Sequence, residues 1–251
     1  MSTAWVIGAS SGIGAAIACQ LAHSGFQVGL TGRNLERLAA EVEKINAGGG
    51  NATAFRADVT ERRELEGAFH ELQATYGEPH LLVHCAGTNV TRRWWDDLDV
   101  EGVESVVATN LSSVIGSVDL VLPGMRKAQS GQIVVVSSWA GWRYMSGAGV
   151  GYGASKAALS PLVESINDQE GLNGIRATHL CPGEVRTPIL YTKEVPPTEE
   201  EIAQMLPPER VAEAVDFITG MPADTCINEL VISGTANGIY SRVGYHQGRS
   251  Q

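Results

Sequence analysis

The sequence predicts an α/β fold: a doubly wound parallel sheet of about seven strands with helices on both faces. Two observations lead to this prediction. Short apolar runs rich in β-branched residues alternate with segments of helical period along nearly the whole chain. Several runs are also apolar at every position, as strands are when helices cover both sides of a sheet. The predicted strands are Ala4–Ile7, Gln27–Thr31, Thr53–Ala57, Leu81–Cys85, Gln132–Ser137, Arg176–Cys181 and Glu229–Ile232.

The composition is that of an ordinary globular chain, 251 residues long and 43% hydrophobic. This length suffices for a large core, so we expect a single domain over 1–251. The net charge of −10 argues against nucleic acids and anionic membrane surfaces as partners. No basic segment precedes the first apolar stretch, and no uninterrupted apolar run reaches about 18 residues, so we expect a cytoplasmic protein that does not enter membranes.

The four cysteines, Cys19, Cys85, Cys181 and Cys226, lie far apart in the sequence. They form no C-x-x-C pair, and no histidine stands at metal-ligand spacing. We therefore expect reduced, structural cysteines and no metal site. A nucleophilic thiol is the alternative, but it needs a cationic, partly exposed setting that none of these local sequences shows.

Two segments interrupt the regular alternation of strands and helices. The segment 188–208 is rich in proline and acidic residues and follows the carboxyl end of a predicted strand, where ligands bind in such sheets. We interpret it as a lid over the substrate, with a solvated surface excursion as the alternative. The tail 234–251 lacks a periodic pattern, and it either covers the site of a neighbouring subunit or frays.

A glycine-rich turn follows the first predicted strand and opens a helix. Its glycines are separated by three residues and then by one, which allows a tight turn and a close approach of the backbone to a pyrophosphate. Free amides at the start of the helix then face the anion. Glycines also serve ordinary tight turns, but this position favours a Rossmann-type dinucleotide site, and no lysine-serine or lysine-threonine pair follows to make a P-loop. The residues predicted to bind there are Gly8, Ser10, Ser11, Gly12, Ile13 and Gly14.

The end of the second predicted strand bears on the choice of cofactor. A carboxylate usually stands there in enzymes that bind the ribose hydroxyls of NAD, but this chain has Arg33 and Asn34. The planar fork of Arg33 suits a 2'-phosphate. We therefore predict NADP(H) as the cofactor, with NAD(H) possible. An exposed surface arginine is the alternative interpretation.

Tyr152 and Lys156 stand four residues apart, which on a helix places both side chains on one face. A free phenol is a poor base at neutral pH, but a nearby ammonium and a cationic nicotinamide favour its phenolate. Tyr152 is therefore a candidate general acid or base. Ser138 follows the buried strand 133–136 and is a further candidate. Either residue of a lone Y-x-x-x-K pattern can also be ordinary helix surface.

Taken together, these motifs resemble those of the short-chain dehydrogenase/reductase family, over nearly the whole chain. Asp58-Val59 is similar to the pair that contacts adenine, and Ala86-Gly87 to the end of the family's N-N-A-G motif. Asn110 falls where the family keeps its catalytic asparagine. The resemblance adds these cofactor contacts to the glycine turn and the Arg33 region: Asp58, Val59, Ala86, Gly87, Tyr152, Lys156, Pro182, Gly183, Val185 and Thr187.

The resemblance also implies a role for each catalytic residue. Tyr152 would be the general acid or base, and Ser138 would hydrogen-bond the reacting oxygen. Lys156 would hold the nicotinamide ribose and support the phenolate, while Asn110 would anchor a water that leads from Lys156 to solvent. The implied reaction is a hydride transfer between the nicotinamide and a ketone or secondary alcohol, and no metal is required.

Two departures from the family pattern stand out. His84-Cys85 replaces the usual asparagine pair before the alanine-glycine dipeptide, which we expect to alter packing rather than chemistry. The interval from Ser138 to Tyr152 is one residue longer than the commonest spacing. Ser137 is therefore a minor candidate for the catalytic serine.

The resemblance also indicates which segments would surround the substrate, and they hold many large side chains. These would suit a bulky or aromatic substrate, with packing between subunits as the competing explanation. Arg92, Arg93 and Arg143 keep an anionic substrate possible. The helices 101–128 and 152–171 are expected to form the faces of a homodimer or homotetramer. The large side chains are Trp94, Trp95, Trp139, Trp142, Tyr144, Met145 and Tyr191.

Three other functions compete with a ketone reductase or alcohol dehydrogenase. A cofactor-binding regulator without turnover is possible because a fold does not guarantee activity, but the catalytic residues are present. A lyase of the halohydrin dehalogenase type would lack the glycine turn and carry arginine in place of Lys156. A 3-oxoacyl-thioester reductase is the nearest alternative, although basic docking patches are not obvious in this acidic chain.

Overall fold

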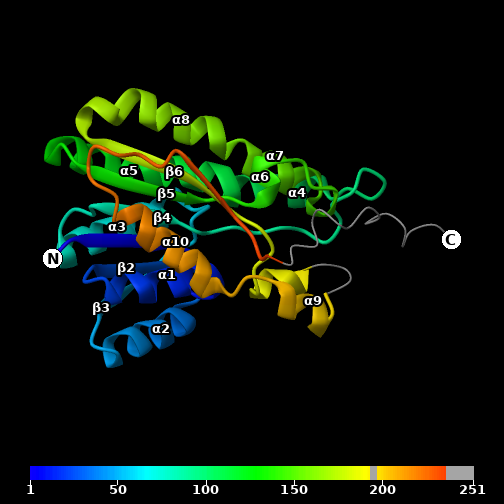
Figure 1. Ribbon diagram of the computed structural model, residues 1–251, viewed down its shortest axis with the longest axis horizontal. Helices are drawn as coiled ribbons and strands as arrows, with labels where there is room; N and C mark the ends of the chain where they lie inside the picture. The colour runs from blue at the N-terminus through cyan, green and yellow to red at the C-terminus, as the bar shows by residue number, and fades with distance from the viewer. Residues whose placement is uncertain (193–196, 236–251) are drawn as a thin grey trace.

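The computed structural model describes residues 1–192 and 197–235 (Figure 1). Its centre is a seven-stranded sheet in the order β3-β2-β1-β4-β5-β6-β7, and every neighbouring pair is parallel. This confirms the predicted fold class and all seven predicted strands, with shifts of one or two residues at their ends. The strands are β1 Thr3–Ile7, β2 Gln27–Gly32, β3 Asn51–Arg56, β4 Leu81–His84, β5 Gly131–Val136, β6 Ile175–Pro182 and β7 Glu229–Ile232.

Helices cover both faces of the sheet, and each face has its own apolar core. Because side chains alternate along a strand, successive residues of β1 enter opposite cores: Val6 packs on one side and Trp5 on the other. The first core is closed by α1 (Gly12–His23), α2 (Leu35–Ala47) and α10 (Pro208–Thr219). The second is closed by α3 (Arg62–Tyr76), α5 (Ser113–Ala128) and α8 (Leu159–Glu170).

The strand order reverses beside β1, which pairs with β2 on one side and with β4 on the other. In open parallel sheets, ligands bind in the crevice at the carboxyl ends of the strands next to such a switch point. Short helices lie at this end of the molecule in Figure 1. They are α4 (Val100–Val107), α6 (Trp139–Trp142), α7 (Val150–Ala157) and α9 (Glu199–Gln204).

The helical segment from α4 to α5 contains one irregular turn. A π-helical turn, η1 (Ala108–Ser112), joins α4 to α5 and carries Asn110. Such turns occur frequently at functional sites. The whole segment Val100–Ala128 is long and apolar enough to cross a membrane by length and composition, with 39% of its most apolar window buried. Its α5 part packs on β4 and β5 as a core helix does, so the feature is weak evidence for a membrane span.

Two parts of the predicted lid are helical, η4 (Pro188–Thr192) and α9. Thr198 and Glu201 form a capping box at the start of α9. Residues 193–196 of this segment lie outside the described residues, as does the predicted tail from 236 onward. The remaining short helical turns are η2 (Ser146–Ala148) and η3 (Gly171–Asn173).

Candidate active site

The glycine turn lies between β1 and α1, and its backbone leaves no room for side chains. Gly8 has φ of +84°, and a Cβ there would lie 2.5 Å from the backbone nitrogen of Ala86. A Cβ at Gly14 would overlap the carbonyl oxygen of Gly8. The amide nitrogens of Gly8 and Ala9 both donate to the carbonyl of Thr31, at 2.8 and 3.1 Å, which ties the turn to β2. The glycines are therefore required by close backbone contacts at this position.

The start of α1 fits the pyrophosphate of a dinucleotide. The N-cap residue Ser11 makes no side-chain cap hydrogen bond, and the first turn holds no acidic residue. The amides of this turn therefore face the switch point without a carboxylate that would repel an anion. Ser10 and Ile13 are half-buried beside them, and Ile13 lines the cavity described below.

The predicted adenosine end of the site lies where β2 and β3 end. Arg33 is exposed just beyond β2, and its charge acts on Asp58, which follows β3. Burial opposes ionisation of Asp58, but two hydrogen bonds from Thr60 and the nearby positive charges of Arg33 and Arg56 leave the pKa below its ordinary value. Arg33 and Asp58 thus lie at one end of the site. Val59 packs against the second core.

Asn34 has a local structural role. Its Oδ1 accepts a hydrogen bond from the backbone nitrogen of Arg37 at 2.9 Å and caps α2. This cap explains the position of the Asn34 side chain without a bound ligand.

The loop after β6 closes over the glycine turn from the opposite side. Pro182 ends the strand, and the amide of Gly183 donates to the carbonyl of Ile232 at 2.7 Å. Val185 is buried and forms an isolated bridge with Leu206. Thr187 lies against the glycine turn, since a Cβ at Gly12 would lie 3.1 Å from its methyl group. The structure therefore places the loop after β6 against the glycine turn.

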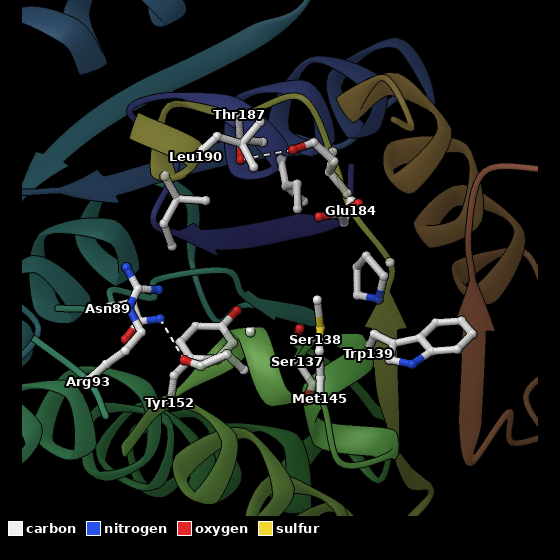
Figure 2. Close-up of a pocket in the computed structure, with 17 residues that line it drawn as sticks. Asn89, Arg93, Ser137, Ser138, Trp139, Met145, Tyr152, Glu184, Thr187 and Leu190 are labelled. Carbon is white, nitrogen blue, oxygen red and sulfur yellow. Dashed lines mark hydrogen bonds between the residues drawn. The ribbon is translucent and has the colours of Figure 1, made fainter. Parts of the chain in front are cut away.

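Tyr152, Ser138 and Lys156 converge at the carboxyl end of β5. Figure 2 shows Tyr152 facing the cavity with Ser137 and Ser138 beside it. Ser138 begins α6 and hydrogen-bonds the Tyr152 hydroxyl, whereas Ser137 donates to the backbone carbonyl of Lys156 at 3.2 Å. This arrangement favours Ser138 over Ser137 as the serine that acts with Tyr152. Lys156 is buried, and its Nζ donates to the carbonyl of Val136 at 3.0 Å and lies 5.9 Å from the centre of the Tyr152 ring.

Asn110 is fully buried in the π-helical turn. Its Oδ1 accepts from the amide of Thr88 at 2.8 Å, and its Nδ2 donates to Thr88 O at 3.0 Å and to Ser155 Oγ at 3.1 Å. A Cβ at Gly87 would lie 3.4 Å from Lys156 Nζ and 3.6 Å from Asn110 Oδ1. Gly87 therefore lies close to both Asn110 and Lys156, and because it has no side chain the space between these two groups stays open.

Burial controls the ionisation of the site. It raises the pKa of Tyr152 above its ordinary value, and the hydrogen bond with Ser138 acts in the opposite direction. Burial also lowers the pKa of Lys156 to about 8. From the sequence, the Lys156 ammonium is expected to favour the phenolate, but in this structure it donates to Val136 O, and burial has the larger effect on the pKa of Tyr152.

Comparison with known proteins agrees with this geometry. The family model described as short chain dehydrogenase matches residues 2–197. The chain belongs to the short-chain dehydrogenase/reductase family. An uncharacterized oxidoreductase of Staphylococcus saprophyticus is 31% identical over 90% of this chain and 94% of that protein. Glycine betaine reductase ATRR of Emericella nidulans is 32% identical over 90% of this chain, which spans only 18% of that longer protein.

Solved structures of similar proteins contain the predicted type of cofactor. An alcohol dehydrogenase from the archaeon Thermococcus sibiricus, complexed with 5-hydroxy-NADP, is 26% identical with a TM-score of 0.84, covering 94% of this chain and 97% of that one. A serine dehydrogenase complexed with NADP+ is 28% identical with a TM-score of 0.83, covering 92% and 94%. This short-chain dehydrogenase/reductase is therefore an oxidoreductase with a nicotinamide dinucleotide, NADP(H) or NAD(H), as its cofactor.

A cavity of about 140 Å³ opens beside Tyr152. On one side it is lined by the loop 182–187 after β6, which the family resemblance predicts to contact the nicotinamide and which we call the nicotinamide loop, and on the other by residues that precede α7. Figure 2 shows Arg93 and Asn89 on one side of the Tyr152 ring and Trp139 on the other. The lining residues outside the nicotinamide loop and the serines include Asn89, Arg93, Trp139, Met145, Ala148, Tyr152, Ile189 and Leu190.

Few of the large side chains named from the sequence line this cavity. Of the seven large side chains named from the sequence, only Trp139 and Met145 line this cavity. Trp142 packs edge-on against Trp139 with ring centroids 5.0 Å apart, and Arg143 stacks on Trp142 at 4.3 Å. The other four do not line the cavity, and three of them are exposed at 79%, 91% and 68%. The four are Trp94 and the exposed Trp95, Tyr144 and Tyr191.

His84 and Cys85 have packing roles. Burial, with the charge of Lys156 as a smaller cause, lowers the pKa of His84 to about 3, and its Nε2 lies 3.0 Å from the Ser113 hydroxyl. Burial raises the pKa of Cys85 to about 12, so its thiol is not a nucleophile at neutral pH. Neither side chain lines the cavity.

One cluster of possible metal ligands was missed in the sequence. His179 and Cys181 point to the same face of β6, and strand pairing places Glu229 of β7 beside His179. Their donor atoms all lie within 4.8 Å of one another. Residues two positions apart on a strand share a face, so the pairing of His179 with Cys181 could have been predicted from the sequence. The third residue is 50 positions away and could be added only from the sheet order.

Proposed function

We propose that this protein is an NADP(H)-dependent oxidoreductase that interconverts a ketone and a secondary alcohol, with Tyr152 as the general acid or base. The observation that carries the proposal is the meeting of Tyr152, Ser138 and Lys156 at one end of a cavity whose other wall is the predicted nicotinamide loop. Assay of purified protein with NADPH and a panel of ketones, followed by loss of NADPH absorbance, tests it. No turnover with any ketone, although NADPH binds, would contradict the proposal.

The chain's own residues supply orientation and proton transfer, and the bound nicotinamide supplies or accepts the hydride. In the direction of reduction, the Tyr152 hydroxyl donates a proton to the carbonyl oxygen, which Ser138 holds by a hydrogen bond. Lys156 holds the ribose hydroxyls of the nicotinamide side and stabilises the phenolate that remains on Tyr152. Asn110 lies between the Thr88 backbone and Ser155, and it keeps open the route by which Lys156 recovers a proton.

The pKa of Lys156 predicts how the rate depends on pH. We expect kcat/KM for reduction to be constant at neutral pH and to fall above about pH 8, because Lys156 then loses its proton. Tyr152 keeps its proton over this range, since its pKa is raised. A pH profile measured for the wild type and for Lys156→Arg checks this. The arginine variant should retain its activity to higher pH, and a wild-type profile that stays flat to about pH 10 would contradict the assignment.

The preference for NADP(H) depends on Arg33. We expect Arg33→Ala to weaken NADPH binding by about 10- to 100-fold and to leave NADH binding unchanged, because only NADPH carries the 2'-phosphate. Fluorescence titration with both cofactors measures this. Arg63→Ala is the control, since Arg63 is an exposed arginine on α3, outside the predicted site. Equal losses for both cofactors, or tighter binding of NADH to the wild type, would show that Arg33 is only a surface residue.

A 3-oxoacyl-thioester reductase remains the second candidate. A 3-ketoacyl-ACP reductase from Sinorhizobium meliloti is 28% identical with a TM-score of 0.83 over 96% of this chain, and a variant actinorhodin polyketide ketoreductase with NADPH is 27% identical with a TM-score of 0.85. The net charge of −10 does not favour docking of an acidic carrier protein. Turnover of a 3-oxoacyl thioester above that of free ketones would favour this candidate.

We also propose that the protein acts in the cytoplasm as a homodimer or homotetramer. All four cysteines are unpaired, as in proteins of reducing compartments. Ile115 of α5 is 50% exposed, and the small side chains of Ala154 and Ala157 are exposed on α7. These apolar and small residues suit close packing between subunits.

A further inference from the structure

Three side chains that can bind metal ions meet where β6 and β7 run side by side. His179 and Cys181 of β6 are 2% and 0% exposed, and Glu229 of β7 is the register partner of His179. The earlier residues on the same face of β6, Ile175 and Ala177, belong to the second apolar core. An imidazole, a thiol and a carboxylate thus replace apolar side chains at the end of this row. All three are ligands that zinc takes in proteins.

The distances between the donor atoms fit a single tetrahedral ion. His179 Nδ1 lies 3.4 Å from Cys181 Sγ and 3.1 Å from Glu229 Oε2, and the three donor atoms all lie within 4.8 Å of one another. A tetrahedral zinc ion, with bonds of about 2.3 Å to sulfur and about 2.1 Å to nitrogen or oxygen, separates its ligands by about 3.4 to 3.6 Å. The Glu229 side chain is 38% exposed, so its carboxylate can adjust to the ion and opens a path from solvent.

The three side chains contact one another without a metal, and these contacts hold the donors in place. The imidazole of His179 hydrogen-bonds Glu229, and both of its nitrogens lie near Cys181 Sγ, at 3.4 and 3.6 Å. When zinc binds to Nδ1, the imidazole carries its proton on Nε2 and the thiol proton goes to solvent. Because the donors are already gathered, binding costs little ordering of side chains.

The ligand types and the nearby charges favour zinc over magnesium or calcium, which prefer oxygen ligands alone. A thiolate and the Glu229 carboxylate together balance the two charges of the ion. Glu164 of α8 is exposed, and its negative charge also acts on His179, which attracts a cation to this end of the sheet. Lys156 acts on Cys181 with a positive charge, which favours the thiolate form that zinc requires.

The position of the three residues in the sheet indicates what a bound ion would do. β7 has four residues and stands at the edge of the sheet, where its described partner is β6. Glu229 is the first residue of β7, so an ion held here would tie the start of the edge strand to β6. Cys181 directly precedes Pro182, where the nicotinamide loop begins. The same ion would therefore fix the strand end from which this loop departs.

We propose that His179, Cys181 and Glu229 bind one zinc ion, with water in the fourth position, and that the ion cross-links β6 and β7. This revises the expectation from the sequence that the chain has no metal site. None of the three ligands lines the cavity beside Tyr152, so the ion takes no part in hydride transfer. The inference is independent of the proposed function.

Titration of the purified, chelator-treated protein with Co²⁺ and then Zn²⁺ tests the site. One equivalent of Co²⁺ is expected to produce the near-ultraviolet charge-transfer band of a cobalt thiolate, and Zn²⁺ is expected to displace it, since zinc binds such sites more tightly than cobalt. Cys181→Ser should abolish the band. Glu229→Gln keeps the size of an exposed side chain and should weaken zinc binding by at least about tenfold, the smallest loss usual even for residues that only support a ligand.

Cys19→Ser is the matched control. Cys19 Sγ lies 3.6 Å from His23 Nδ1 on α1, but among the described residues this pair belongs to no cluster of three ligands. The control should bind Co²⁺ and Zn²⁺ as the wild type does. Absence of the band in the wild type, its loss in Cys19→Ser, or unchanged zinc affinity in Glu229→Gln would overturn the site. The last comparison decides the matter even if Cys181→Ser does not fold.

Urea denaturation tests the cross-link itself. Zinc should raise the midpoint of unfolding of the wild type, because an ion that binds the folded chain stabilises it, and the shift should be smaller in Glu229→Gln. Equal shifts in the two proteins, or no shift in the wild type at a zinc concentration that saturates the site, would show that the ion does not hold β7 to β6.

Discussion

Tyr152→Phe is expected to lower kcat by about 10²- to 10⁴-fold, the range that a positioned general acid or base contributes. The phenylalanine ring preserves the packing of α7 and the contact with Lys156, whose Nζ lies 5.9 Å from the ring centre. Only the proton and the hydrogen bond with Ser138 are removed. Binding of NADPH should therefore change little. Steady-state assay of ketone reduction, with a parallel NADPH titration, measures both quantities.

Tyr144→Phe provides the matched control. Tyr144 lies eight positions earlier in the chain, is 91% exposed and does not line the cavity. The same chemical change there should leave kcat within about twofold of the wild type. If Tyr152→Phe retained full kcat, the proton would have to come from another group. If it lost NADPH binding as well, the loss of rate would report on the shape of the site instead of on proton transfer.

The fold was predictable because its signals are local. The apolar runs are contiguous in the sequence, and they predicted all seven strands. The strand order reverses beside β1, which pairs with β2 on one side and with β4 on the other. The helix predicted over 101–128 is interrupted by the π-helical turn at Asn110. That turn is fixed by hydrogen bonds to Thr88 and Ser155, which lie far away in the sequence, so no local pattern reveals it.

The candidate site was predictable only in part, for a similar reason. Helical spacing alone places Tyr152 and Lys156 on one face. Which of two neighbouring side chains enters a cavity depends on how a loop packs, and the sequence does not separate Arg92 from Arg93. The loop before α7 is held by Gly149 and by a hydrogen bond from Asn89 to Ala148 O at 3.0 Å. These contacts turn Arg93 inward.

Gly8→Ala is expected to lower the free energy of unfolding by about 2–5 kcal/mol and to weaken NADPH binding by at least about tenfold. The new methyl group brings two costs. A non-glycine residue at φ of +84° is strained, and the Cβ would lie 2.5 Å from the Ala86 nitrogen and 2.8 Å from its Cα, both of which belong to the backbone. The turn must then move away from β4 and from Thr31, taking the amides at the start of α1 with it. Urea denaturation and fluorescence titration measure the two effects.

Gly25→Ala separates strain from contact. Gly25 has φ of +89°, close to that of Gly8, but a Cβ there would meet no atom within 4 Å. The free energy of unfolding of this variant should fall only by the cost of the backbone conformation, about 1–2 kcal/mol. The variant should bind NADPH as the wild type does. A Gly8 variant that loses no more stability than the Gly25 variant and keeps its NADPH affinity would show that the turn can shift without harm. The close approach of the turn to Ala86 would then not be what shapes the phosphate site.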